Sequence, residues 1–521
     1  MSEREKIKIT YSTLASPNPK LDQYYDEEVA AARANAGQTY PMYIDGEWVS
    51  SEKTFAKVSP IDLNLTIGHF AAGGKTEIDR AVAAARRAFP AWRAMPWQER
   101  NALLRKAADL ISDRLFEIGA VVSLEIGKNR LEALGDVEES ADLIRYCLDS
   151  MAANDGFSKP LLQESPRHHN RSVLKPHGVW GVIAPFNFPA ALSAGPAGAA
   201  LTAGNTVVLK PADDAPLTSY LIAQCFHDAG LPAGVFNMVL GSDEPGKALV
   251  ANPDVDGITF TGSYDVGMSI IRQFAAGGAY PRPVIAEMGG KNPTIITRKA
   301  DLETAATGVM RSAFGLTGQK CSACSRVFVD NAVKDEFIAR LVALTKEKIT
   351  VGDPTEKQNY MGPIINGDAY NAYKKYAADL RAAGTVLTGA ETIEENGYFV
   401  APTIVTDLPA DHYLWTHEMF APVVCIDGFD DKDEAMARAN AIDLGLTAGF
   451  FGEAPDEVNW FLDNIEAGTL YVNRATGATT GAWPGYQSFG GWKGSSGTAK
   501  AAGSFYYLPQ YMKEQSHTVV D

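Results

Sequence analysis

The chain has few cysteines, no block of basic residues and no long apolar segment, and each shortage excludes a class of protein. Five cysteines in 521 residues build no disulfide framework, which favours a reducing compartment. The formal net charge of −16 makes nucleic acid and anionic membranes unexpected partners. The small and apolar run 190–204 contains Gly and Pro and is shorter than the roughly 20 residues of a membrane helix. We expect a packed internal helix there.

The N-terminus shows no targeting signal. Its first residues, MSEREKIKIT, lack the apolar core of a secretory signal, and their acidic residues do not suit a mitochondrial transit peptide. We therefore expect a cytoplasmic protein. Residues 1–40 are mixed and polar, which indicates an N-terminal arm that either lies on the body or is partly mobile. The length exceeds that of one ordinary domain, and 46% apolar with 21% charged residues is typical of a globular protein.

Short apolar strands alternate with helix-length segments, which predicts βαβ units and mostly parallel sheets. A first series of strands is expected at 179–185, 206–210, 235–241, 257–262 and 283–287, and a second, after Cys321, at 326–329, 422–426 and 468–472. Apolar residues recur with helical spacing over 103–115, and further helices are expected at 76–90 and 134–153. The fold class is therefore α/β, with two Rossmann-like lobes. A ligand cleft is expected between the lobes, at the carboxyl ends of their strands.

A carboxylate and a thiol between these two series carry the chemistry. Glu287 opens Glu-Met-Gly-Gly-Lys, and Cys321 lies within Gly-Gln-Lys-Cys-Ser-Ala-Cys-Ser-Arg. A cysteine can attack a carbonyl carbon, and a carboxylate can deprotonate the water that releases the product. A single cysteine is more often a core residue. Cys324 completes a C-x-x-C, but no second such pair is present to make a zinc site, so we interpret Cys324 as structural.

Several separated motifs resemble those of the aldehyde dehydrogenase superfamily, in the same order and from about residue 43 to the C-terminus. Residues 185–189 resemble its Pro/aromatic/Asn turn, and residues 207–212 its cofactor-binding strand end. Residues 260–267 resemble its nicotinamide-cofactor loop, and residues 418–422 its second cofactor clamp, although the family usually has Gly in place of Ala421. Single motifs such as Gly-Ser before a helix are weak. Six motifs in one order are not expected from packing alone.

The resemblance implies a covalent mechanism. Cys321 would attack the aldehyde as a thiolate, and the side chain of Asn187 with the backbone N–H of Cys321 would stabilise the oxyanion. Hydride transfer to the cofactor would leave a thioester, which water activated by Glu287 would hydrolyse. The presence of Glu287 distinguishes the chain from the acylating, coenzyme A-dependent branch of the superfamily. No metal is implied.

The resemblance also implies a dinucleotide site. Lys210 would approach the adenosine ribose, Ser263 the pyrophosphate at a helix N-terminus, and Glu418 the nicotinamide ribose. Asp213 favours NAD over NADP, since a carboxylate accepts from a 2′-hydroxyl and repels a 2′-phosphate. The full set of predicted cofactor residues is Pro185, Phe186, Lys210, Ala212, Asp213, Gly262, Ser263, Gly267, Glu287, Met288, Gly289, Glu418 and Phe420.

Within the superfamily, the segments around Cys321 and after Phe489 resemble the 1-pyrroline-5-carboxylate (glutamate γ-semialdehyde) dehydrogenases. By that resemblance Ser322 and the backbone of Gly503 and Ser504 would hold the substrate carboxylate, with Tyr511 as an aromatic wall. The segment 479–488 is about three residues longer than the subfamily pattern and contributes Trp483 and Tyr486, and Ser495 adds one more residue. A bulkier aromatic or aliphatic aldehyde is therefore the alternative substrate.

Two alternatives of another class stay open: a thiol esterase, and a non-catalytic NAD-binding protein. Hydrolysis without NAD would reveal the first, and loss of Cys321, Glu287 or Asn187 would have indicated the second. Residues 505–520 are expected to form a strand that pairs near 171–175 and, by the resemblance, bridges to a second subunit in a homodimer or dimer-based oligomer. The expected domains are 1–40 as an N-terminal arm, 41–157 with 178–288 as the NAD-binding domain, 158–177 with 504–521 as oligomerisation strands, and 289–503 as the catalytic domain.

Overall fold

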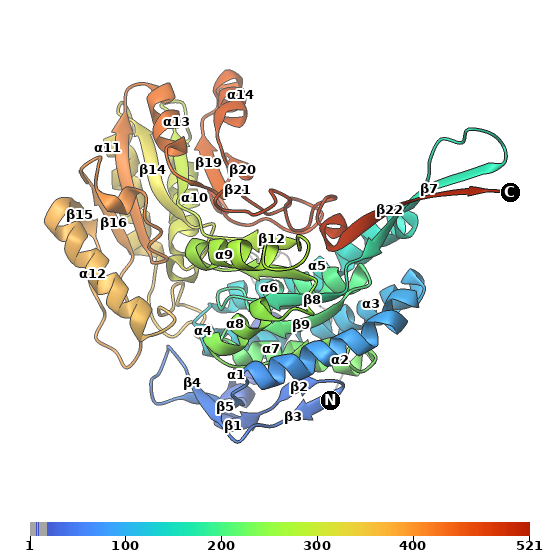
Figure 1. The fold of residues 1–521 in the computed structure, drawn as a ribbon. Helices are drawn as coiled ribbons and strands as arrows, with labels where there is room; N and C mark the ends of the chain where they lie inside the picture. The colour runs from blue at the N-terminus through green and yellow to red at the C-terminus, as the bar shows by residue number, and fades with distance from the viewer. Residues whose placement is uncertain (1–6, 8, 10–17) are drawn as a thin grey trace.

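A computed structural model describes residues 7, 9 and 18–521, and two seven-stranded sheets organise this part of the chain (Figure 1). The first sheet has the order β12-β11-β8-β9-β10-β2-β3 and is parallel from β12 to β10. Its strands are β2 Met42–Ile44, β3 Glu47–Val49, β8 Val179–Ile183, β9 Thr206–Lys210, β10 Phe236–Met238, β11 Gly257–Thr261 and β12 Val284–Glu287. The predicted first series of strands is confirmed.

The second sheet has the order β15-β16-β17-β14-β13-β19-β20, and only its edge pair β15 and β16 is antiparallel. Its strands are β13 Asn292–Ile296, β14 Cys324–Asp330, β15 Thr385–Thr388, β16 Thr403–Thr406, β17 Val423–Phe429, β19 Thr447–Phe451 and β20 Thr469–Val472. Buried strands of this kind need helices on both faces of the sheet. Two Rossmann-like lobes therefore form the body, as predicted.

Helices cover the two sheets. Those of the first lobe are α1 Pro19–Ala34, α2 Lys75–Ala94, α3 Trp97–Asp113, α4 Leu115–Ile126, α5 Arg130–Ala153, α6 Ala191–Thr202, α7 Pro216–Asp228, α8 Asp243–Ala251 and α9 Tyr264–Ile270. Those of the second are α10 Leu302–Phe314, α11 Lys334–Lys348, α12 Gly367–Ala383, α13 Lys432–Asn440 and α14 Pro455–Asn464. The segment predicted as an internal helix is α6, and all of its residues except Leu192 are buried. None of the helices in the described part is long and apolar enough to cross a membrane.

Several predicted helix limits shift: α2 runs to Ala94 instead of residue 90, and α3 begins at Trp97 instead of residue 103. Local contacts explain two further differences. The pattern over 103–115 divides at Arg114 into α3 and α4, and Arg114 pairs with Glu117 at 2.7 Å. α5 begins four residues before the predicted limit because the side chain of Asn129 accepts from the backbone N–H of Glu132 at 3.0 Å, a typical N-cap.

The described part of the N-terminal arm lies on the first lobe. Tyr25 in α1 is fully buried and its hydroxyl donates to Ser123 Oγ of α4 at 2.5 Å. Arg130 of α5 pairs with Asp22 of α1 at 2.8 Å. β1 Gln38–Tyr40 joins β5 Thr66–Ala71 and β4 Thr54–Val58 in a small sheet. The prediction for residues 1–6, 8 and 10–17 falls outside the described residues.

The C-terminal strand pairs where the sequence predicted. β22 Met512–Val520 runs antiparallel to β7 His168–Pro176, with His517 opposite Arg171, and β6 Ser158–Pro160 completes the sheet. Figure 1 shows β7 and β22 reaching out from the body. Residues 505–511 differ from the prediction: they form a turn and a short helical turn, because the rings of Tyr507 and Tyr511 pack inward. β18 Leu444–Gly445 and β21 Trp492–Lys493 form a two-stranded ladder. The predicted domain limits stay predictions.

Candidate active site

The predicted nucleophile and base meet where the chain passes from one sheet to the other. Glu287 ends β12, and Asn292 begins β13 a few residues later. Cys321 lies just before β14, the parallel neighbour of β13. The first lobe therefore contributes the carboxyl ends of its strands, as predicted. The expectation was wrong for the second lobe, which contributes amino ends, because the chain runs directly from the end of β12 into the start of β13.

The loop of Cys321 is held through its backbone by residues 290 and 292. The side-chain amide of Asn292 donates to the carbonyl oxygen of Cys321 at 2.7 Å. The same carbonyl would lie 2.4 Å from a Cβ at Gly290, so only glycine permits this approach. The thiol is half-buried, and burial raises its pKa to about 12, with the charges of Glu418 and Glu287 acting in the same direction. The protein alone thus keeps Cys321 protonated at neutral pH.

Asn187 lies on the turn between β8 and α6 and reaches the nucleophile loop. Its side chain is buried, with 4% exposed, and its amide donates to the carbonyl oxygen of Gln319 at 3.1 Å. One amide N–H is thereby fixed two residues before Cys321, and the other is available to an oxyanion. This arrangement suits the predicted role.

Glu287 has one engaged and one free oxygen. Oε1 accepts from the hydroxyl of Ser496 at 2.8 Å, whereas Oε2 is buried without a hydrogen-bond partner among the described residues. Burial raises the pKa of Glu287 to about 8, against the hydrogen bonds from Ser496 and the backbone of Gly491. A carboxyl group with this pKa is suited to proton transfer near neutral pH.

The residues before Cys321 are conformationally strained. Leu316 and Thr317 have φ values of 46° and 55°, in the left-handed region that residues with side chains rarely adopt. The carboxylate of Glu132 holds them, since Oε2 accepts from the backbone N–H of Leu316 at 3.0 Å and Oε1 pairs with Lys320 at 2.5 Å. Glu132 belongs to α5, so the first lobe supports the nucleophile loop of the second.

The predicted cofactor residues lie along the crevice at the first sheet. β9 and β10 lie on one side of β8, and β11 and β12 on the other, so the strand order reverses at β8, where dinucleotides bind in such folds. Pro185 and Phe186 follow β8, Lys210 ends β9, and Gly262 and Ser263 follow β11. This arrangement fits NAD.

Individual side chains agree with that fit. Burial lowers the pKa of Lys210, against the attraction of Asp213 and Asp243. Ala212 is half-buried and Asp213 exposed, so the Asp213 carboxylate is accessible to a ligand. Ser263 is the N-cap of α9, and its hydroxyl makes no hydrogen bond to the helix. The pyrophosphate of NAD would face free N–H groups there.

Residues 418–422, which resemble the family's second cofactor clamp, lie beside the same crevice. The rings of Phe186 and Phe420 meet edge to face at 5.9 Å, one from each lobe. Glu418 Oε1 accepts from the backbone N–H of Gly290 at 3.0 Å. A Cβ at Gly289 would lie 1.9 Å from the other Glu418 oxygen, so this position requires glycine. Met288 is buried and packs on Gly267. Burial raises the pKa of Glu418 to about 7.

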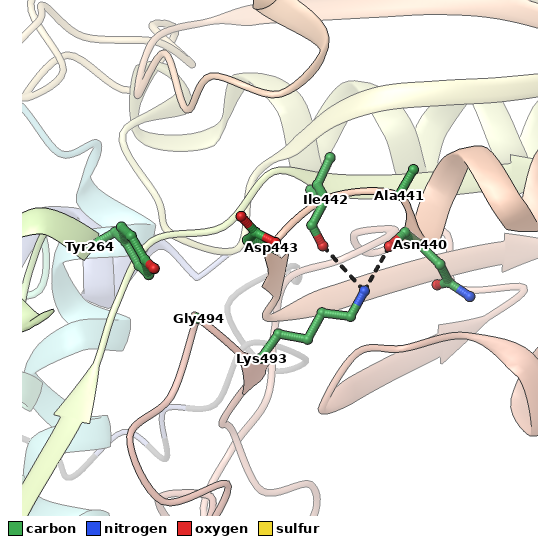
Figure 2. A pocket seen from close by; sticks show the side chains of 7 residues that line it. All are labelled: Tyr264, Asn440, Ala441, Ile442, Asp443, Lys493 and Gly494. Carbon is green, nitrogen blue, oxygen red and sulfur yellow. Dashed lines mark hydrogen bonds between the residues drawn. The ribbon is translucent and has the colours of Figure 1, made fainter.

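A cavity of about 710 Å³ lies elsewhere between the lobes. Figure 2 shows Tyr264, at the start of α9, facing the segment after α13, where Lys493 Nζ donates to the carbonyl oxygens of Asn440 and Ile442 at 2.7 and 3.2 Å. Its lining includes neither Cys321 nor Glu287, so it is not the reaction site. A smaller cavity between Gly290, Lys320, Glu418 and Phe420 adjoins the nucleophile loop instead.

The predicted substrate residues behave differently from one another. Ser322 is buried, and its carbonyl accepts from Thr479 Oγ at 2.5 Å. Gly503 has a φ of 67° and Ser504 is half-buried, so this turn can present backbone N–H groups. Tyr511 is fully buried: its ring lies 4.8 Å from Trp180, and its hydroxyl bonds to Tyr507 at 2.8 Å. The structure thus places Tyr511 in the core, with no surface open to a substrate.

The longer segment 479–488 is anchored next to the turn of Gly503 and Ser504. The indole N–H of Trp483 donates to Asp142 Oδ2 of α5 at 2.9 Å. Pro484 packs on Gly503, whose added Cβ would lie 3.1 Å from Pro484 Cα. Tyr486, by contrast, is 81% exposed. The extra residues therefore support the turn of Gly503 rather than cover the site with aromatic rings.

Sequence reasoning missed the roles of Ser496 and Asn292. Ser496 gave no separate signal in the sequence, because its contact with Glu287 joins residues 209 positions apart. Asn292 begins a buried strand and gave no separate signal. The described residues contain no group of three or more His, Cys, Asp or Glu placed to hold a metal ion.

Comparisons with known proteins agree with this site. A profile described as "Aldehyde dehydrogenase family" matches residues 48–517. The 1-pyrroline-5-carboxylate dehydrogenase of Staphylococcus haemolyticus (strain JCSC1435) is 38% identical over 498 residues, or 94% of this chain and 95% of that protein. A structure of 1-pyrroline-5-carboxylate dehydrogenase from Thermus with bound NAD superposes with a TM-score of 0.94 at 33% identity and covers 99% of each chain. A lactaldehyde dehydrogenase structure gives 0.86 at 30% identity, covering 93% of this chain and 100% of that one.

Two α/β lobes with a cysteine, a carboxylate and a dinucleotide crevice between them define a thiol-dependent dehydrogenase. The chain belongs to the aldehyde dehydrogenase family. It is an NAD-dependent enzyme that oxidises a small-molecule aldehyde, which confirms the predicted family, fold class, reaction and cofactor.

Proposed function

We propose that the aldehyde is L-glutamate γ-semialdehyde, the open form of 1-pyrroline-5-carboxylate, and that the product is glutamate. One support is the way the segment 479–488 connects the two parts proposed to hold the substrate carboxylate: Thr479 donates to the carbonyl oxygen of Ser322, and Pro484 packs on Gly503. Two of the three relatives named above are, by their names, 1-pyrroline-5-carboxylate dehydrogenases. The bulkier aldehyde is less favoured, because Tyr511 and Trp483 are buried.

The proposed reaction begins at Cys321. Its thiol gives its proton to solvent water and its sulfur bonds to the aldehyde carbon, as the C=O π electrons move to the oxygen; the resulting oxyanion accepts from the side chain of Asn187 and the backbone N–H of Cys321. When bound, NAD would accept the hydride from the aldehyde carbon. The acyl group then left on Cys321 is released by water, from which Glu287 takes a proton through its free oxygen.

In this proposal the cofactor is held by both lobes. Lys210 and Asp213 bind the adenosine ribose, Ser263 the pyrophosphate, and Glu418 the nicotinamide ribose. The rings of Phe186 and Phe420 close the crevice beside them. Asp213 disfavours a 2′-phosphate and so favours NAD over NADP.

The proposal extends to assembly and location. β22 pairs with β7 on one side and forms the edge of its sheet, and its last residues Val519 and Val520 are 58% and 55% exposed. An edge strand of this kind is a template for a second chain. We infer a homodimer or dimer-based oligomer, in the cytoplasm.

The test is NADH formation across a panel of aldehydes: glutamate γ-semialdehyde, succinate semialdehyde, and aliphatic and aromatic members. The highest kcat/KM is expected for glutamate γ-semialdehyde, since a carboxylate site left unpaired by the wrong substrate discriminates strongly. Preference for a long aliphatic or aromatic aldehyde would overturn the substrate and leave the family assignment intact.

A further inference from the structure

A buried ion pair lies next to the turn between β8 and α6, which carries Asn187, the proposed oxyanion donor. Lys128 Nζ and Asp136 Oδ2 are 3.1 Å apart, and neither side chain has any exposed surface. Removing two charges from water costs several kcal/mol per ion, and their attraction offsets this cost only in good geometry. A buried pair is therefore poor evidence for added stability and calls for another explanation.

Each member of the pair contacts the segment that follows Asn187. The ammonium group of Lys128 lies 3.5 Å from the centroid of the Phe188 ring, a cation–π contact. Asp136 Oδ1 accepts from the backbone N–H of Ala191 at 2.9 Å. Ala191 is the first residue of α6, and the preceding Ala190 has no side-chain acceptor for a cap. Asp136 therefore supplies the cap from α5.

These contacts fix the turn at both ends. The ring of Phe188, next to Asn187, rests on a cation, and the start of α6 is held by the anion paired with that cation. A carboxylate is also favoured at a helix N-terminus by the helix dipole. Glu132 and Lys320, which support the loop of Cys321, are the other charges that act on Lys128.

We propose that Lys128 and Asp136 are positioning residues for the oxyanion donor: together they hold residues 188–191 so that the Asn187 amide stays aligned with Cys321. The inference rests on the proposed role of Asn187 and goes beyond it. Displacement of a catalytic group by about 1 Å can cost up to about 100-fold in rate, so the pair acts on catalysis through geometry.

The experiment measures the burst rate of NADH formation at saturating NAD in the full-length enzyme. Asn187→Ala is expected to slow the burst by about 10²- to 10³-fold, the usual loss of one oxyanion donor. Asp136→Ala is expected to slow it by about 10- to 100-fold. In the Asn187→Ala background, Asp136→Ala should cost at most roughly twofold more, because the two residues act as one unit.

Glu125→Gln is the matched control. Glu125 is a fully buried carboxylate of the same lobe that caps another helix, accepting from the backbone N–H groups of Leu217 and Thr218 at 2.6 and 3.0 Å. The Glu125→Gln substitution is expected to lower the melting temperature but to change the burst rate by less than about twofold at saturating NAD. Asp136→Asn keeps the volume and an acceptor oxygen, and serves where Asp136→Ala does not fold.

The outcomes separate the two proposals. A wild-type burst in Asn187→Ala removes the proposed oxyanion role and this inference with it. If Asn187→Ala slows the burst, three results would overturn the inference alone. The Asp136 variants could keep a fast burst, they could multiply the loss in burst rate caused by Asn187→Ala, or they could lose no more burst rate than Glu125→Gln. Slow Asp136 variants with non-additive losses and a fast Glu125→Gln support it.

Discussion

Ser496 donates a 2.8 Å hydrogen bond to Oε1 of Glu287, and the second carboxylate oxygen of Glu287 is left without a partner among the described residues. The hydrogen bond orients the carboxylate and stabilises its charged form, while burial favours the protonated form. The pKa of about 8 is the balance of the two. One oxygen thus fixes the group, and the other is free to act on water.

Glu287→Gln is expected to keep a single-turnover burst of NADH and to lower steady-state turnover by about 10²- to 10⁴-fold, because an amide cannot take a proton from water. Stopped-flow and steady-state measurements on the same preparation distinguish the two phases. Loss of the burst together with turnover would mean that Glu287 acts earlier, on the thiol of Cys321.

Where deacylation limits turnover, kcat should rise with pH and level off above about pH 8, since only the ionised Glu287 accepts a proton. Ser496→Ala removes a hydrogen bond that lowers the pKa of Glu287, so the midpoint should move to higher pH and kcat at pH 7 should fall. The check is the pH profile of kcat for both proteins. A midpoint that stays in place or moves down would contradict this account.

Cys321→Ala should abolish oxidation and leave NAD affinity nearly unchanged, because the cofactor contacts lie on other residues. Cys324→Ala is the matched control: its thiol is buried and bonds to Thr294 at 3.2 Å, so the expected loss is roughly 1 kcal/mol of stability with activity retained. An inactive Cys324 variant beside an active Cys321 variant would reverse the assignment.

The thiol of Cys321 should react slowly with iodoacetamide at neutral pH in the NAD-free enzyme. Its pKa of about 12 predicts a rate that rises about tenfold per pH unit with no plateau below pH 10. Mass spectrometry of the modified peptide gives the rate for this residue alone. A plateau near pH 8 would mean that some group of the protein stabilises the thiolate.

Asp213→Ala should narrow the preference for NAD over NADP, because the exposed carboxylate, proposed to lie near the adenosine ribose, would repel a 2′-phosphate. The ratio of kcat/KM for the two cofactors measures this. The neighbouring Asp214 is engaged with Lys57 at 3.0 Å and Asn366 at 2.8 Å, so Asp214→Ala should leave the ratio unchanged. Equal ratios in Asp213→Ala and the unmodified enzyme would place Asp213 away from the ribose.

Local patterns allowed much of the fold to be predicted. Strands β8, β9, β11 and β12 are short apolar runs between helices, and each occurs where its residues indicated. The segment 505–511 was misread because aromatic residues favour strands in general, whereas here Tyr507 and Tyr511 are drawn into the core. Burial is a property of the whole fold and is not visible in a short window.

The site was predicted through its motifs, and its supports were not. Cys321, Glu287 and Asn187 carry chemistry that residue type alone can suggest. Asp136 and Ser496 make contacts with residues 55 and 209 positions away, and neither has a sequence pattern of its own. The same limit hid the orientation of the second lobe, which depends on how β12 continues into β13.

The strained residues Leu316 and Thr317 imply an order of events during folding. Their conformation is held by Glu132, 184 residues away from Leu316 in the chain, and the following Gln319 is fixed by Asn187 and by the backbone of Ile365. None of these partners is local, so the nucleophile loop reaches its shape only after the two lobes have docked. The loop that carries Cys321 is therefore among the last parts of the molecule to form, after the helix that carries Glu132 and the turn that carries Asn187 are in place.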